Sequence, residues 1–164
     1  NILNALKAAA LLNIDYSWHF VGHCYSSEYL EKIHHLIAQL HLKEKVFLHG
    51  RVDKDKLREF YINSSIFVLV SRLEGYGMVY AEAMHYGLPI VGSQKGAVPE
   101  LVKDGENGFL CDPEKPDHIA QAIIKLTDKD TWQQIHQNNL LKASSLMDRE
   151  SFIQHGKSFF ESLL

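Results

Sequence analysis

The sequence predicts an α/β fold, a doubly wound parallel sheet with helices on both faces. Two observations support this prediction. Short apolar runs alternate with segments of helical period along most of the chain. One of these runs, "SIFVLV" at residues 65–70, is apolar on both of its faces. Such a run is typical of a strand in a sheet that is covered by helices on both sides.

The first half of the chain contains three predicted helices and three predicted strands. The helices are expected at residues 2–12, 27–40 and 53–64, and the strands at residues 17–22, 45–50 and 65–70. The third helix has a clear start signal in Asp53, because an aspartate oxygen can accept hydrogen bonds from the amides of the first turn.

The second half continues the alternation. A helix at residues 78–87 is expected to end at Gly87 as its C-cap. It is followed by a strand at residues 88–93 and a short helix at residues 97–105, which has Pro99 in its first turn. A turn and a second strand are expected at residues 106–112, and residues 116–164 are expected to form three helical pieces. The chain opens on a helix with no strand before it. We therefore expect residues 1–164 to form a single domain, an N-terminally truncated fragment of a longer two-domain protein.

Composition excludes several classes of protein. A chain of 164 residues can bury one sizeable core. Its 17 basic and 20 acidic residues give a net charge of −3, which does not favour a nucleic-acid surface or a polybasic membrane face. Two cysteines fit a reducing compartment, so we expect a cytoplasmic protein. No run reaches the roughly 18 apolar residues of a membrane span.

The stretch "EGYGMVYAE" at residues 74–82 lies where the third strand gives way to a helix. Ligands of such sheets bind beyond the carboxyl ends of the strands. Gly75 and Gly77 allow a ligand to approach the backbone closely, and the helix N-terminus favours phosphate. Glu74 and Glu82 flank this turn, and carboxylates accept the paired hydrogen bonds of sugar hydroxyls. The pattern favours a nucleotide sugar.

Other interpretations remain open on residue types alone. The glycines can simply form a turn between two solvated glutamates. The turn also resembles half of a dinucleotide-binding fingerprint, but Tyr80 occupies the place of the third small residue. The histidines His34, His35 and His41 are expected on the surface of one helix, because no carboxylate or cysteine lies at ligand spacing. Lys95, on a loop at the carboxyl end of its strand, is expected to be solvated.

The stretch "SRLEGYGMVYAEAMHYGLPIVGSQKGAVPELVKDGENGFLCDP" resembles the signature region of nucleotide-sugar glycosyltransferases with the two-domain GT-B fold. More narrowly, it is similar to the large retaining family known as glycosyl transferases group 1, or family four. The motif of that family is two glutamates separated by seven residues, which Glu74 and Glu82 match. The similarity extends over about residues 2–128, and the chain looks like the C-terminal, donor-binding half of such an enzyme.

The resemblance implies roles for individual residues. Glu74 would be catalytic and would hold hydroxyls of the donor sugar, whereas Glu82 would hold the ribose. The implied donor-binding set is Arg51, Val52, Glu74, Gly75, Tyr76, Gly77, Met78, Val79 and Glu82. Within it, the backbone amides around the glycine turn would meet the diphosphate or the sugar, and the loop at residues 51–52 would lie against the base.

The resemblance also implies the reaction. A UDP- or GDP-linked sugar would be transferred to a saccharide or lipid-linked acceptor with retention of configuration, without a bound metal or other cofactor, in polysaccharide or lipopolysaccharide biosynthesis. The N-terminal domain, which binds the acceptor and allows peripheral association with the cytoplasmic membrane face, would be missing. So would an upstream arginine and lysine, and we therefore expect the fragment alone to be inactive. The alternatives are a non-catalytic nucleotide-binding or regulatory module of the same fold, and a nucleotide-sugar epimerase.

Overall fold

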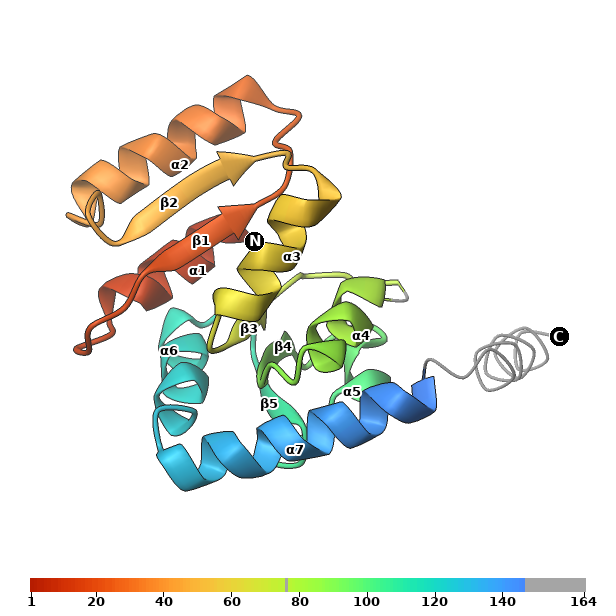
Figure 1. Cartoon of the computed structure of the whole chain (residues 1–164). Helices are drawn as coiled ribbons and strands as arrows, with labels where there is room; N and C mark the ends of the chain where they lie inside the picture. Colours follow the sequence, from red (N-terminus) through yellow and green to blue (C-terminus); the bar gives the residue numbers. More distant parts are fainter. Residues whose placement is uncertain (76, 147–164) are drawn as a thin grey trace, which may run out of the picture.

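The structure, a computed structural model, describes residues 1–75 and 77–146. Helices and strands alternate along the chain, as the sequence predicts (Figure 1). In chain order they are α1 (Ile2–Ala10), β1 (Trp18–Val21), α2 (Ser27–Gln39), β2 (Val46–Gly50), α3 (Lys54–Asn63), β3 (Phe67–Leu69), α4 (Met78–His85), β4 (Ile90–Ser93), α5 (Val98–Leu101), β5 (Gly108–Cys111), α6 (Pro116–Lys125) and α7 (Lys129–Leu146). The expected α/β class is confirmed.

The strands form two parallel sheets, where the sequence suggested one. Strands β1 and β2 pair with each other, and β3, β4 and β5 form a second sheet with β4 in the centre. Among the described residues no strand pairs with both β1 and β3, so the parallel strands of the α/β fold are divided between two hydrogen-bonded sheets. Parallel pairing places the carboxyl ends of the strands of each sheet at one edge.

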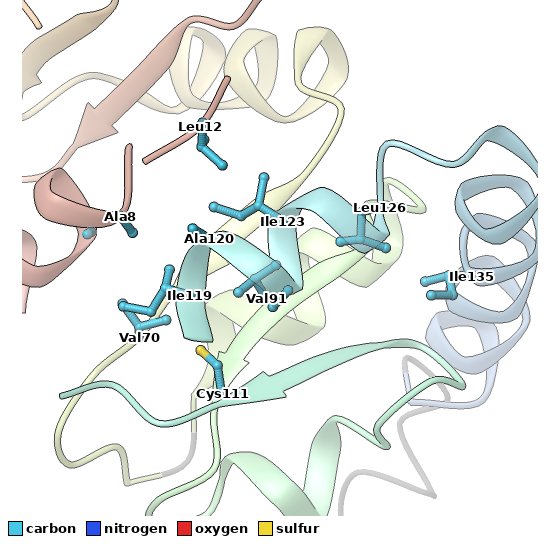
Figure 2. Close-up of a cluster of buried hydrophobic side chains, with 12 residues drawn as sticks. Ala8, Leu12, Val70, Val91, Cys111, Ile119, Ala120, Ile123, Leu126 and Ile135 are labelled. Atoms are coloured by element: carbon cyan, nitrogen blue, oxygen red, sulfur yellow. The ribbon is translucent and has the colours of Figure 1, made fainter. Parts of the chain in front are cut away.

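A shared apolar core holds the two sheets together. Helices α1 and α6 pack on each other, and α6 contributes Ile119 and Ile123 to the cluster in Figure 2. Trp18 of the first sheet and Val68 of the second pack against this same cluster. Full burial of an aliphatic side chain contributes about 1.5–3 kcal/mol. Burial of these side chains therefore favours the arrangement in which both sheets pack on the same cluster.

The helix ends show which local signals were correct. The carboxylate of Asp53 accepts a hydrogen bond from the amide of Lys56 at 2.8 Å, which confirms the predicted N-cap. The C-cap of α4 is Tyr86, one residue earlier than predicted, and Gly87 follows it with φ 71°. The predicted helix at residues 97–105 is shorter, spanning only α5. The last of the three predicted C-terminal helices lies outside the described residues.

No helix within the described ranges is both long enough and apolar enough to cross a membrane.

Candidate functional site

The glycine turn lies between the carboxyl end of β3 and the start of α4. Gly77 is the N-cap of α4 and has a left-handed backbone, with φ 66° and ψ 43°. Because glycine has no side chain, it offers no cap to the first-turn amides of Met78 and Val79. Those amides and the positive end of the helix dipole can bind an anion. Tyr76 lies outside the described residues, so its predicted amide contact is not placed.

The loop after β4 packs against the backbone of Glu74. The backbone amide of Ala97 donates to the carbonyl of Glu74 at 3.3 Å. Gly96, at φ 67°, packs so closely that a Cβ atom built on it would lie 2.8 Å from the same carbonyl oxygen. Among the described residues, the half-buried side chain of Glu74 has no hydrogen-bond or ion-pair partner. The backbone of Glu74 is thus fixed, and its carboxylate is available to a ligand.

Tyr80 fills the space beneath the glycine turn. Its side chain is fully buried, and its hydroxyl donates to the carbonyl of Leu69 at 2.7 Å. Burial raises the pKa of the Tyr80 hydroxyl, and the nearby charge of Glu74 raises it further, so the hydroxyl stays a donor. A Cβ atom on Gly77 would lie 2.7 Å from this ring. The large side chain therefore ties the turn to β3, at the position where a dinucleotide fingerprint has a small residue.

Glu82 lies on the exposed face of α4, one turn inside the helix that follows Glu74 and the glycines. The Tyr61 hydroxyl of α3 donates to Oε2 of Glu82 at 3.0 Å. Burial raises the pKa of Tyr61, with the hydrogen bond to Glu82 as the next largest cause. Tyr61 is therefore the donor of this pair, and the second carboxylate oxygen of Glu82 stays available.

Two basic side chains close to the turn are paired with acids that follow β5. Arg72 donates to both carboxylate oxygens of Glu114, at 2.7 and 3.1 Å. This hydrogen bond is the main reason that the pKa of Glu114 is lowered. Lys95 lies 3.9 Å from the carboxylate of Asp112, with 46% of its side chain exposed. The Arg72–Glu114 pair is solvent-exposed, whereas Asp112 of the second pair is half-buried, and both pairs bring the segment after β5 to the same edge as the glycine turn.

The loop with Arg51 and Val52 follows the carboxyl end of β2, in the other sheet. The amide of Gly22 donates to the carbonyl of Gly50 at 2.8 Å, which joins the loop after β1 to the last residue of β2. Arg51 is exposed and Val52 is half-buried. Within the described residues, no hydrogen bond or ion pair links either residue to Glu74 or Glu82. Their predicted contact with a base stays a prediction.

The histidines singled out in the sequence do not share one helix. His34 and His35 are exposed on α2, but His41 lies beyond the helix end with φ 57°, which corrects the expectation for this residue. In the part of the chain that the structure describes, no group of three or more histidine, cysteine or acidic residues is arranged to hold a metal ion.

Two residues of this site were missed by the sequence analysis. Gly96 follows the carboxyl end of a strand beside the glycine turn, a position that topology alone marks as close to a ligand. Tyr61 carries no such signal, because its contact with Glu82 depends on how α3 packs beside α4. A tyrosine in an amphipathic helix is otherwise an ordinary core residue.

Comparison with known families gives one match over most of the chain. The model of the family described as "Glycosyl transferases group 1" matches residues 1–144. Among curated proteins, the chain is 32% identical over 103 residues to N-acetyl-alpha-D-glucosaminyl L-malate synthase of Bacillus anthracis, covering 63% of this chain and 26% of that protein. It is 26% identical over 154 residues to an uncharacterized glycosyltransferase of Methanocaldococcus jannaschii, covering 94% of this chain and 43% of that protein.

Solved structures show the same architecture. The chain superposes on HepE of Anabaena, solved in complex with UDP, with a TM-score of 0.85 and 25% identity, covering 97% of this chain and 44% of that one. It also matches the C-terminal domain of a glycosyl transferase group 1 protein of Francisella tularensis, with a TM-score of 0.77 and 24% identity, covering 85% of this chain and 75% of that one. The chain spans less than half the length of the two curated relatives.

Proposed function

The chain belongs to the glycosyl transferases group 1 family, and from this premise we propose that it is the donor-binding domain of a two-domain GT-B glycosyltransferase. The domain binds a UDP- or GDP-linked sugar. In the intact enzyme the sugar is transferred, with retention of configuration, to a saccharide or lipid-linked acceptor in polysaccharide or lipopolysaccharide synthesis. In this proposal the acceptor is held mainly by the other domain of the enzyme, and the enzyme is cytoplasmic or associated peripherally with the cytoplasmic face of the membrane.

One observation carries this proposal: in the chain order the uncapped N-terminus of α4 lies between two carboxylates, one without a partner among the described residues and one bonded to Tyr61. Gly77 leaves the amides of Met78 and Val79 for a diphosphate. Glu74 precedes the turn, with its carboxylate unpartnered among the described residues, and Glu82 lies one turn inside the helix with one oxygen occupied by Tyr61. A diphosphate on the amides would then direct its sugar toward Glu74 and its ribose toward Glu82.

The same arrangement suits the chemistry of transfer. When the bond between the anomeric carbon and the diphosphate breaks, the electron pair stays with the leaving diphosphate, which gains negative charge. Fixed amide dipoles at a helix N-terminus stabilise charge that develops there. Arg51 and Val52 are assigned to the base. The binding of UDP by HepE of Anabaena supports a nucleotide ligand for this fold.

Thermal-shift measurements on the intact protein with a panel of UDP- and GDP-linked sugars test the proposal. A ligand that binds only the folded state stabilises it by about 2.7 kcal/mol at a concentration of 100 times its Kd. We expect one nucleotide sugar to raise the melting temperature, and residues 1–164 alone to bind the same sugar more weakly and to transfer nothing. The absence of any shift across the panel would contradict the donor-site assignment, and turnover by residues 1–164 alone would contradict their proposed inactivity.

We also propose that transfer needs no bound metal, because the α4 amides and the basic residues of the longer protein neutralise the diphosphate. The intact enzyme is therefore expected to keep its transfer activity in excess EDTA, measured as product formed per minute against an EDTA-free control. Complete loss of activity, restored by added magnesium or manganese, would show that a metal ion performs this role.

A further inference from the structure

We propose that Tyr61 is a positioning residue that orients the carboxylate of Glu82 toward the ribose of the nucleotide. This inference rests on the proposed function and extends it to a residue on a different helix. The Tyr61 hydroxyl lies 3.0 Å from Oε2 of Glu82, and the two side chains come from α3 and α4. The hydrogen bond joins α3, which follows the predicted base-binding loop at residues 51–52, to α4, which carries the predicted ribose ligand Glu82.

The contact matters because Glu82 lies on an exposed helix face, where a glutamate side chain samples several rotamers. Binding a ligand through such a side chain requires that its rotamer be fixed, at a cost in conformational entropy. A donor already bonded to Oε2 fixes the carboxylate before the ligand arrives. The hydroxyl of tyrosine donates one hydrogen bond, and an ionised carboxylate can accept several, so Oε1 is still able to accept from the diol of a ribose.

The ring of Tyr61 is itself held in place. It stacks on Tyr86 with a centroid distance of 5.2 Å and an interplanar angle of 4°. The second aromatic neighbour is Phe67 of β3, whose ring centroid lies 6.2 Å from that of Tyr61, with an interplanar angle of 34°. A side chain with two aromatic neighbours has little rotamer freedom, so its hydroxyl is presented to Glu82 in one direction.

A purely structural role has a different consequence. If the hydrogen bond merely ties α3 to α4, its loss would weaken the binding of any nucleotide by loosening the domain. If Tyr61 acts through Glu82, its loss would weaken only ligands whose ribose hydroxyls bond to that carboxylate. The two roles can therefore be separated by ligands that do or do not have these hydroxyls.

The test uses Tyr61→Phe in the intact protein, which removes the hydroxyl and keeps the stacked ring. Calorimetry first establishes whether UDP or GDP binds the wild type, and the tighter ligand is then compared with its 2′,3′-dideoxy analogue. Tyr61→Phe is expected to lower the affinity for the nucleoside diphosphate about three- to tenfold and to leave the affinity for the dideoxy analogue unchanged. Tyr16→Phe is the matched control, since Tyr16 is also half-buried and donates to the Ala9 carbonyl at 2.6 Å.

A double-mutant cycle completes the experiment. In a Glu82→Ala background, Tyr61→Phe is expected to cause no further loss of affinity, because the residue through which it acts is gone. An equal loss for both ligands, or a full additional loss in the Glu82→Ala background, would overturn the positioning role and leave the proposed function intact. Failure of the wild type to bind either UDP or GDP would instead refute the donor site itself, and the role of Tyr61 with it.

Discussion

Replacement of Glu74 by alanine is expected to lower the affinity for the intact nucleotide sugar by about one to two powers of ten, because hydrogen bonds to a charged group contribute about 1.5–3 kcal/mol. The affinity for the corresponding nucleoside diphosphate should change much less. The reason is the position of Glu74, before the glycine turn and away from the end of the turn where Glu82 lies. Calorimetric titration of the wild type and the variant with both ligands measures the difference.

Two further variants sharpen this test. Glu82→Ala should lower the affinities for the nucleotide sugar and for the nucleoside diphosphate by similar factors, since both ligands contain the ribose. Glu74→Gln should recover part of the affinity for the nucleotide sugar, because its carbonyl oxygen still accepts hydrogen bonds. Transfer by Glu74→Ala should fall more than binding if the contact tightens as the bond to the diphosphate breaks. If Glu74→Ala lowers the affinities for both ligands equally, Glu74 does not bind the sugar.

Most elements of the fold could be predicted because their signals are local. The apolar period of residues 27–40 corresponds to α2, and the cap at Asp53 is visible in the residue type itself. The run at residues 65–70 became β3, shortened to Phe67–Leu69. The placement of the glycine turn between β3 and α4 follows from that order, so the position of the candidate site in the fold could be predicted from the sequence.

Contacts between elements were not accessible in the same way. The separation of the strands into two sheets depends on which strands pair, and apolar period carries no information on pairing partners. The hydrogen bond of Tyr61 to Glu82 and the packing of Gly96 on Glu74 both join residues about 20 positions apart, on different elements. Residue type and spacing predicted the two carboxylates as ligands, whereas the contacts that Tyr61 and Gly96 make with them depend on tertiary packing.

Gly96→Ala is expected to disturb the site through Glu74, although Gly96 need not touch the ligand. A Cβ atom at this position would lie 2.8 Å from the carbonyl oxygen and 3.1 Å from the amide nitrogen of Glu74. Both atoms belong to the backbone, so relief requires that the loop after β4 or the glycine turn move. Such movement would also break the hydrogen bond from Ala97 to the Glu74 carbonyl. Since misplacement of a reacting group by about 1 Å can lower a rate about 100-fold, transfer should fall at least tenfold.

The left-handed backbone of Gly96 contributes a separate effect, which Gly105→Ala isolates. Gly105 has φ 76°, close to the 67° of Gly96, but a Cβ atom built on it meets nothing within 4 Å. Both variants should therefore lose about 1–2 kcal/mol of stability from the backbone conformation, measured by urea unfolding. Only Gly96→Ala should also lose transfer activity and affinity for the nucleotide sugar at a temperature where both variants are folded. If the two variants bind and transfer equally well, the loop after β4 does not hold Glu74 in place.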